Sequence, residues 1–234
     1  MRVLVTGGRG WIGTETMGKL AEKGYEPVAY DLKDGRSIHD ITKLRIWMAS
    51  CDRVIHLAAI PHPLAGLKWE DYWKANVAGT QNVAEVAAEL GITRMVYSSS
   101  TGYYGAQNGF QAAPLMMEES PNAVQQLYMM GAPDMTPYNE AALAYMVSKV
   151  MAESILAAYA FANRLPTVIL RFAPVTRDGK PWGERGLLCK RSTAAEALTT
   201  AIDMPLNDIY EIYNIADEGP VSKQQWEGDI NGTA

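Results

Sequence analysis

Three residues carry the clearest chemistry in this 234-residue sequence: a serine, a tyrosine and a lysine. Tyr145 and Lys149, in the run "YMVSK", lie one helical turn apart and therefore share a helix face. A tyrosine with its usual pKa of about 10 is a poor base at neutral pH, but a neighbouring ammonium favours the phenolate and lowers that pKa. Tyr145 is therefore predicted to exchange a proton with a substrate hydroxyl, and Ser100, at the end of a predicted strand, to hydrogen-bond the same hydroxyl.

A glycine-rich turn near the N-terminus predicts a binding site for a dinucleotide. Gly7, Gly10 and Gly13 follow the pattern G-x-x-G-x-x-G, directly after the apolar run "RVLVT" and at the start of a helix-like segment. Glycines in this place permit a tight turn and let a pyrophosphate approach the backbone. The helix N-terminus, around Trp11 and Ile12, then offers free N–H groups and a positive dipole end to the phosphates.

Acidic residues after the second predicted strand favour NAD as that dinucleotide. Asp31 stands 18 residues after Gly13, where a carboxylate accepts hydrogen bonds from an adenosine ribose and repels a 2′-phosphate. Asp40 and Ile41, in "HDIT", are predicted to lie near the adenine amino group. NADP stays open because three nearby cations could hold a 2′-phosphate: Arg9, Lys33 and Arg36.

Alternating strands and helices must position these residues. Apolar, β-rich runs predict strands at residues 2–6, 27–31, 53–59, 94–100, 166–172 and 210–216. Apolar residues at helical spacing predict helices at residues 12–23, 69–90 and 137–163. Strands that alternate with helices indicate an α/β fold with a Rossmann-type, doubly wound parallel sheet.

The remaining segments complete the predicted organisation. Thr193 and Glu196 have the spacing of a capping box that opens a helix ending near residue 203. Residues 102–136 contain several Gly, Pro, Gln and Asn and are predicted to form a long loop with one or two short helical pieces. We interpret residues 1–175 as the dinucleotide-binding domain, and residues 176–234 as a small substrate-binding segment interleaved with the sheet.

Composition restricts the class of protein and its partners. Hydrophobic residues make up 48% and charged residues 20%, and the net charge is −5, as in a soluble globular protein without nucleic acid or membrane as its main partner. No basic leader is visible, and no apolar run approaches the roughly 20 residues of a membrane span. Cys51 and Cys189 form no CxxC pair, so a reduced, cytoplasmic setting is expected. No metal site is expected, because the three histidines lack partners at ligand spacing: His39, His56 and His62.

Eight short motifs in one order resemble a known family. They are "TGGRGWIG", "YD", "HDIT", "VIHLAA", "NVAGTQNV", "YSSSTGYYG", "YMVSK" and "LRFAPV", and they cover most of the chain up to Val175. In these motifs the chain resembles the extended short-chain dehydrogenase/reductases, specifically the NAD-dependent epimerase/dehydratase family. The resemblance implies a Rossmann domain, a bound nicotinamide cofactor, and Ser100, Tyr145 and Lys149 as the catalytic set.

The resemblance also implies further binding residues. Beside the glycine turn and Asp31, the cofactor is expected to contact Leu57, Ala58, Ala59, Ser98, Tyr145, Lys149, Pro174 and Val175, with Asn76 behind the site. The substrate is expected to contact Pro61, His62, Ser100, Thr101, Arg177 and Arg185. Segments 69–90 and 137–163 resemble the helix pair that forms a four-helix dimer interface in this family, which implies a homodimer.

Departures from the family pattern bear on the reaction. "SSSTGYYG" lacks the acidic pair that the sugar dehydratases carry after the serine, so dehydration is disfavoured. Pro174 stands where many members have an asparagine that touches a nucleotide-sugar, and the segment after it is short. A basic cluster in that segment could still cradle a pyrophosphate: Arg177, Lys180, Arg185, Lys190 and Arg191.

Three functions remain open on these residues. The leading hypothesis is an NAD-dependent epimerase of a sugar, nucleotide-linked, that works through a transient ketone with Tyr145 as acid and base. The second is an NAD(P)-dependent dehydrogenase or reductase of a small sugar, uronate or carbonyl compound, which the short C-terminal part favours. The third is a cofactor-binding regulator without catalysis, which has no need of a tuned tyrosine.

Overall fold

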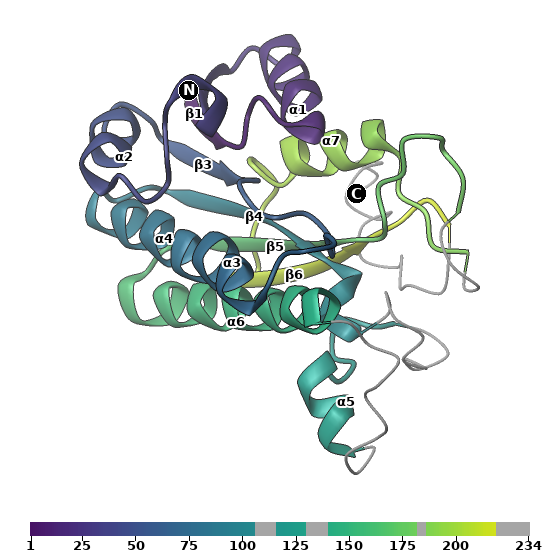
Figure 1. Cartoon of the computed structure of the whole chain (residues 1–234). Coiled ribbons are helices and arrows are strands. Elements are labelled where there is room, and N and C mark those ends of the chain that lie inside the picture. The colour runs from purple at the N-terminus through teal and green to yellow at the C-terminus, as the bar shows by residue number, and fades with distance from the viewer. Residues whose placement is uncertain (106–115, 130–139, 182–185, 219–234) are drawn as a thin grey trace.

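The computed structural model describes residues 1–105, 116–129, 140–181 and 186–218, and confirms the predicted Rossmann-type sheet (Figure 1). All pairings between the six strands are parallel, and their order is β2-β1-β3-β4-β5-β6. The strands are β1 (Arg2–Thr6), β2 (Glu26–Tyr30), β3 (Arg53–His56), β4 (Arg94–Ser100), β5 (Thr167–Phe172) and β6 (Tyr210–Ile215).

Helices cover both faces of this sheet. The described helices are α1 (Trp11–Glu22), α2 (Ile41–Met48), α3 (Trp69–Tyr72), α4 (Gly79–Glu89), α5 (Ala123–Met129), α6 (Glu140–Asn163) and α7 (Arg191–Thr200). A π-helix, Trp73–Ala78, joins α3 to α4, and two short 3₁₀ helices span Leu32–Asp34 and Thr101–Tyr104. In Figure 1, α1 and α7 lie on one side of the sheet, α2, α4 and α6 lie on the other, and α5 stands away from the sheet.

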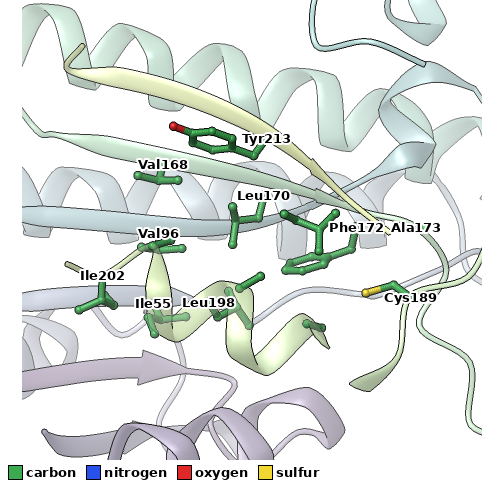
Figure 2. Packing of buried hydrophobic residues seen from close by; sticks show 14 of the residues in the cluster. Ile55, Val96, Val168, Leu170, Phe172, Ala173, Cys189, Leu198, Ile202 and Tyr213 are labelled. Carbon is green, nitrogen blue, oxygen red and sulfur yellow. The ribbon is translucent and has the colours of Figure 1, made fainter. Parts of the chain in front are cut away.

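The apolar runs become strands because both faces of the sheet are covered. Val3 and Val5 belong to the buried cluster shared with α1 and α7, whereas Leu4, between them, belongs to the cluster shared with α2, α4 and α6. The alternation follows from successive strand side chains pointing to opposite faces. Figure 2 shows the first cluster, in which Leu198 and Ile202 lie beside Ile55 of β3. Two cores on one sheet thus fix the register of every central strand.

Several element predictions need correction. The single helix expected at residues 69–90 is three pieces, with the π-helix in its middle. Helix α2 was not predicted, and β3 ends at residue 56 rather than 59. The capping box is wrong: α7 begins at Arg191, the Thr193 hydroxyl bonds a carboxylate of Asp217, and Glu196 pairs with two lysines of the α1 region. Both side chains therefore bond tertiary partners instead of the backbone at the start of the helix.

Helix α6 corrects the expectation about apolar length. Residues Glu140–Ala162 are long and apolar enough to cross a membrane, by length and composition alone. However, 56% of the apolar window is buried inside the fold, as expected for the core helix of a globular domain. The predicted beginning of this helix, at residues 137–139, lies outside the described residues, as do residues 106–115 and 130–136 of the predicted loop at residues 102–136.

Candidate active site

A cavity of about 1010 Å³ opens at the carboxyl ends of the parallel strands. In open α/β sheets this edge is where ligands bind. Most residues predicted for the site line it: Gly7, Gly10, Trp11, Ile12, Gly13, Asp31, Leu57, Ala58, Ala59, Pro61, His62, Ser98, Ser100, Tyr145, Lys149, Pro174, Val175 and Arg177. Four predicted residues lie outside the lining, namely Asp40, Ile41, Asn76 and Thr101, and Arg185 lies outside the described residues.

The glycine turn forms part of the cavity wall. Gly7 has a φ of +70°, and a Cβ on it would lie 2.8 Å from the backbone nitrogen of Ala58. A Cβ on Gly13 would collide with the carbonyl oxygen of Gly7. Gly10 caps α1 without any side-chain hydrogen bond, so the first N–H groups of that helix stay available to a ligand. This cradle fits a pyrophosphate, which needs close backbone approach and free N–H donors.

Asp31 is held ready by the backbone around it. Its carboxylate accepts hydrogen bonds from the amides of Arg9, at 2.8 Å, and Lys33, at 2.9 Å. The same residue caps the 3₁₀ helix Leu32–Asp34. An ordered carboxylate at the end of β2 is placed to accept from ribose hydroxyls and to repel a 2′-phosphate.

The three cations that kept NADP open are engaged with other groups. The Arg9 guanidinium pairs with Asp34 at 3.0 Å, and the Lys33 ammonium donates to the carbonyl oxygen of Arg9. The Arg36 guanidinium lies 3.7 Å from the centre of the Trp47 ring. Because the three cations have these partners, and because the Asp34 carboxylate adds to the negative charge of Asp31, the adenosine end of the cavity favours NAD over the 2′-phosphate of NADP.

Replacing Asp31 by Asn tests this preference. We expect the ratio of NAD to NADP affinity to fall by about 10- to 100-fold, the value of one charge-assisted hydrogen bond. Calorimetric titration with both dinucleotides measures the ratio. The matched control is Asp40→Asn, because Asp40 also caps a helix through a backbone amide but lies outside the lining. An unchanged ratio in Asp31→Asn would show that this carboxylate does not select the cofactor.

Asp40 and Ile41 begin helix α2. The Asp40 carboxylate accepts from the Lys43 amide at 3.1 Å and pairs with its ammonium at 3.4 Å. Side chains ahead of this helix line the cavity instead: Arg36, Ser37, Ile38 and His39. Arg36 stood out in the sequence as a cation, but Ser37 and Ile38 carried no signal, because they lie in an irregular segment whose path is set by packing.

The serine, tyrosine and lysine come together on one wall of the cavity. All three are largely buried, Ser100 at 6%, Tyr145 at 2% and Lys149 at 3% exposure. The Lys149 ammonium donates to the carbonyl oxygen of Ser98 at 3.0 Å, contacts the Tyr97 hydroxyl at 3.3 Å, and lies 5.9 Å from the centre of the Tyr145 ring. The Ser100 hydroxyl accepts from the Gly102 amide at 3.0 Å, which orients it.

Burial tunes the lysine. It lowers the pKa of Lys149 to about 8, because the surroundings disfavour the ammonium, while the carboxylate of Glu153 acts in the opposite direction. An ammonium with this pKa is charged at neutral pH, and it lies 5.9 Å from the centre of the Tyr145 ring. The arrangement can therefore stabilise a tyrosinate and return a proton through it.

Asn76 lies behind the cavity and holds the loop after β3. Its side chain accepts from the amide of Ile60 at 2.8 Å, and donates to the carbonyl of Ile60 at 3.2 Å and to the Ser148 hydroxyl at 3.0 Å. Asn76 lies in the π-helix, the kind of irregularity that frequently marks functional sites. It ties α6, which carries Tyr145, to the loop that lines the cavity.

Buried His56 holds the other end of this loop. The Thr80 hydroxyl donates to a helix carbonyl, so it accepts from Nε2 of His56 at 3.0 Å. Nδ1 then accepts from the Thr6 hydroxyl at 2.6 Å, and the Thr6 oxygen accepts in turn from the amides of Leu57 and Ala58. The arrangement needs a neutral imidazole, because Nδ1 accepts a hydrogen bond and a protonated ring has no accepting nitrogen.

The pH dependence of stability tests this assignment. Burial lowers the pKa of His56 to about 3. Between about pH 6.5 and pH 3 the His56 side chain is therefore protonated in the unfolded chain but not in the folded chain. His56 therefore leaves the free energy of unfolding unchanged above pH 6.5. It lowers that free energy by about 1.4 kcal/mol per pH unit as the pH falls from 6.5 towards 3. Urea unfolding at pH 7 and pH 4.5 measures the change. We expect His56→Gln to show a smaller loss than the parent chain, and equal losses would contradict a neutral buried imidazole.

Among the described residues, no group of three or more His, Cys, Asp or Glu side chains is arranged to hold a metal ion. A parallel sheet with a glycine cradle, an acidic residue after β2 and the triad of Ser100, Tyr145 and Lys149 on the cavity wall define a short-chain dehydrogenase/reductase.

Comparison with known proteins narrows the class. The sequence model of the NAD dependent epimerase/dehydratase family matches residues 3–179, more than half of the chain. The chain belongs to this family, which confirms both the resemblance and NAD as the cofactor.

Curated relatives include two kinds of enzyme. The UDP-glucose 4-epimerase of Erwinia amylovora is 29% identical over 198 residues, which are 74% of this chain and 52% of the relative. The L-arabinose 1-dehydrogenase (NAD(P)(+)) of Haloferax volcanii is 31% identical over 113 residues, 46% of this chain and 44% of the relative. This chain thus spans about half the length of the curated relatives it matches.

Solved structures agree on the fold. The UDP-N-acetylglucosamine 4-epimerase of Bacillus cereus superposes with a TM-score of 0.73 at 21% identity, over 99% of this chain and 84% of that one. A UDP-galactose 4-epimerase gives a TM-score of 0.72 at 24% identity, over 94% and 78%. At these identities the likeness concerns the architecture.

Proposed function

We propose that the protein is an NAD-dependent epimerase of a nucleotide-linked sugar. The observation that carries the proposal is the placement of Ser100, Tyr145 and Lys149 on the wall of the cavity that also contains the glycine cradle. The 4-epimerases among the relatives are consistent with it. "SSSTGYYG" supplies no acidic pair after Ser100, which disfavours dehydration.

In the proposed reaction, NAD held at the glycine cradle and Asp31 would supply reversible hydride transfer at the sugar carbon. Tyr145 removes the proton of the sugar hydroxyl, which leaves a ketone in the substrate. Ser100 donates a hydrogen bond to the same oxygen, and Lys149 keeps the phenolate stable and holds the cofactor ribose. When the ketone has turned its other face, Tyr145 gives the proton back, and the configuration at that carbon is inverted.

The basic segment after β5 is the proposed seat of the substrate phosphates. Arg177 lines the cavity, and its guanidinium lies 5.2 Å from the centre of the Trp11 ring. Arg191 lies 5.4 Å from the same ring and pairs with Glu15 at 2.8 Å. Arg177 is the better candidate for a phosphate, because Arg191 already has a carboxylate partner.

A net dehydrogenase is the second candidate function. Two observations favour it: the arabinose dehydrogenase among the relatives, and Pro174 at a lining position where a side-chain amide would contact a nucleotide-sugar. Addition of sugars to the purified protein separates the two. Interconversion without net change of the cofactor supports the epimerase, stoichiometric reduction of NAD supports the dehydrogenase, and binding of NAD without turnover of any substrate supports a regulator.

A homodimer through α3, α4 and α6 is part of the proposal. Large apolar side chains stay exposed on α3, on the π-helix that follows it and on α6: Trp69 at 39%, Trp73 at 44% and Phe161 at 60%. We expect light scattering to give twice the 25.7 kDa mass of the chain, and expect Trp73→Glu to reduce it. A monomer at micromolar concentration would remove this interface.

A further inference from the structure

Behind the triad lies a buried ion pair that the proposed reaction does not yet use. The Arg171 guanidinium and the Glu153 carboxylate lie 2.7 Å apart, at 1% and 4% side-chain exposure. Arg171 belongs to β5 and Glu153 to α6, one helical turn beyond Lys149. A buried ion pair by itself is weak evidence for a stabilising role. Its position beside the catalytic lysine is consistent instead with a role in the chemistry of the site.

The carboxylate also bonds the strand that carries the catalytic serine. The Ser99 hydroxyl donates to Glu153 at 2.5 Å. Ser99 stands between Ser98, whose carbonyl oxygen accepts from Lys149, and Ser100. The Glu153 carboxylate is therefore linked to two catalytic residues. It bonds Ser99, the neighbour of Ser100 on β4, and it lies one turn from Lys149 on α6.

Arg171 keeps this carboxylate in place and joins it to the segment before α5. Its guanidinium bonds both carboxylate oxygens of Glu153, the Tyr104 hydroxyl at 2.6 Å and the carbonyl oxygen of Glu118 at 2.9 Å. It also lies 3.6 Å from the centre of the Tyr103 ring. These contacts fix the guanidinium from several sides, so the carboxylate has one defined position.

Within the described part of the chain, Glu153 is the carboxylate whose charge acts on Lys149. From α6 it faces Tyr145 and Glu153, from β4 the Tyr97 hydroxyl, and from β3 the neutral ring of His56. Arg171, on β5, pairs with Glu153 at 2.7 Å. Burial raises the pKa of Tyr97 well above its usual value, so that hydroxyl stays neutral.

We propose that Glu153 is a positioning residue that keeps the Lys149 ammonium charged and the Ser99 end of β4 in place. The inference rests on the proposed function, in which a charged Lys149 holds the cofactor and stabilises the tyrosinate. The negative charge acts along the helix on Lys149, and the hydrogen bond acts across the sheet on the strand. The two effects are separable by mutation.

Glu153→Gln removes the charge and keeps a hydrogen-bonding oxygen. We expect the alkaline midpoint at which NAD affinity is lost to move down by about one pH unit, because burial is then unopposed at Lys149. The measurement is NAD titration from pH 6 to pH 10, which needs no turnover. Glu89→Gln is the matched control, since it removes an exposed carboxylate that pairs with Arg45 at 2.7 Å. A folded Glu153→Gln with an unmoved midpoint overturns the charge role.

Two further variants keep the test decisive. Glu153→Gln leaves a buried guanidinium without its partner and endangers the fold, so the double variant Glu153→Leu/Arg171→Met removes both charges together. It is expected to show a smaller downward shift than Glu153→Gln, because no unpaired guanidinium is left to repel the Lys149 ammonium, and an unmoved midpoint overturns the charge role again. Ser99→Ala keeps the ion pair; it is expected to reduce kcat several-fold with the midpoint unmoved, and parental kcat overturns the positional role.

The two proposals fail separately. If the parent chain epimerises no sugar but the midpoint moves in Glu153→Gln, the proposed function is wrong and the charge role of Glu153 stands. If the chain epimerises a sugar and neither Glu153→Gln nor the double variant moves the midpoint, the charge role is wrong and the function stands.

Discussion

Tyr145→Phe is expected to reduce kcat by about 10²- to 10⁴-fold, the usual contribution of a positioned acid and base. Phenylalanine keeps the ring that packs edge-on against Tyr72 but has no proton to give or take. Because the ring remains, the fold and the affinity for NAD should stay close to those of the parent chain. Steady-state rates with a UDP-sugar, together with NAD titration, measure both quantities.

The matched control is Tyr213→Phe. Its hydroxyl bonds Glu211 on β6, and the residue does not line the cavity. This variant should keep the parental kcat. A Tyr145→Phe protein that binds NAD and turns over at the parental rate would exclude Tyr145 as the acid and base.

Lys149→Met is expected to produce the second large effect, a loss of about 10²- to 10³-fold in kcat/KM together with weaker NAD binding. Methionine fills much of the buried volume but removes the charge that stabilises the tyrosinate and the donor that reaches the carbonyl of Ser98. Removal of a charge-assisted contact costs about 1.5–3 kcal/mol, and two functions of the residue are lost at once. NAD titration and steady-state rates separate the two losses.

Lys19→Met is a suitable control for Lys149→Met. That lysine is paired with Glu196 on the α1–α7 side of the sheet and does not line the cavity. If Lys149→Met bound NAD normally and kept its rate while remaining folded, the role assigned to the ammonium would be wrong.

The architecture was predictable because both faces of the sheet are covered. Runs such as Val3–Leu4–Val5 are apolar throughout, since neighbouring residues enter different cores. The glycine spacing and the Tyr145–Lys149 pair were equally visible, because each needs one short stretch of chain. The residues that these local patterns name line one cavity in the fold.

Features set by tertiary packing were not predictable. The π-helix interrupts a continuous helical pattern at Asn76, where the side chain bonds the backbone of Ile60. Helix α2 spans only eight residues, too few for a distinct periodic signal. The Thr193 hydroxyl bonds the carboxylate of Asp217, which is remote in sequence, instead of capping the helix as the local pattern predicted.

The buried ion pair shows the same limit in the site itself. Charged side chains are rarely buried, so neither Arg171 nor Glu153 stands out as an interior residue. One signal was available: Glu153 follows Lys149 by four residues on a predicted helix, the spacing at which side chains interact. Only the packing of α6 on β5 reveals that Arg171 completes the pair.

The most direct test of the central claim follows the sugar and the cofactor together. The purified chain, loaded with NAD, is incubated with UDP-glucose, UDP-N-acetylglucosamine or UDP-glucuronate, while the sugar products and the nicotinamide absorbance are recorded. The account predicts that one of these sugars is converted to its epimer with no net change in reduced cofactor. Reduced cofactor that accumulates in proportion to an oxidised product, with no epimer formed from any of the three, would contradict it.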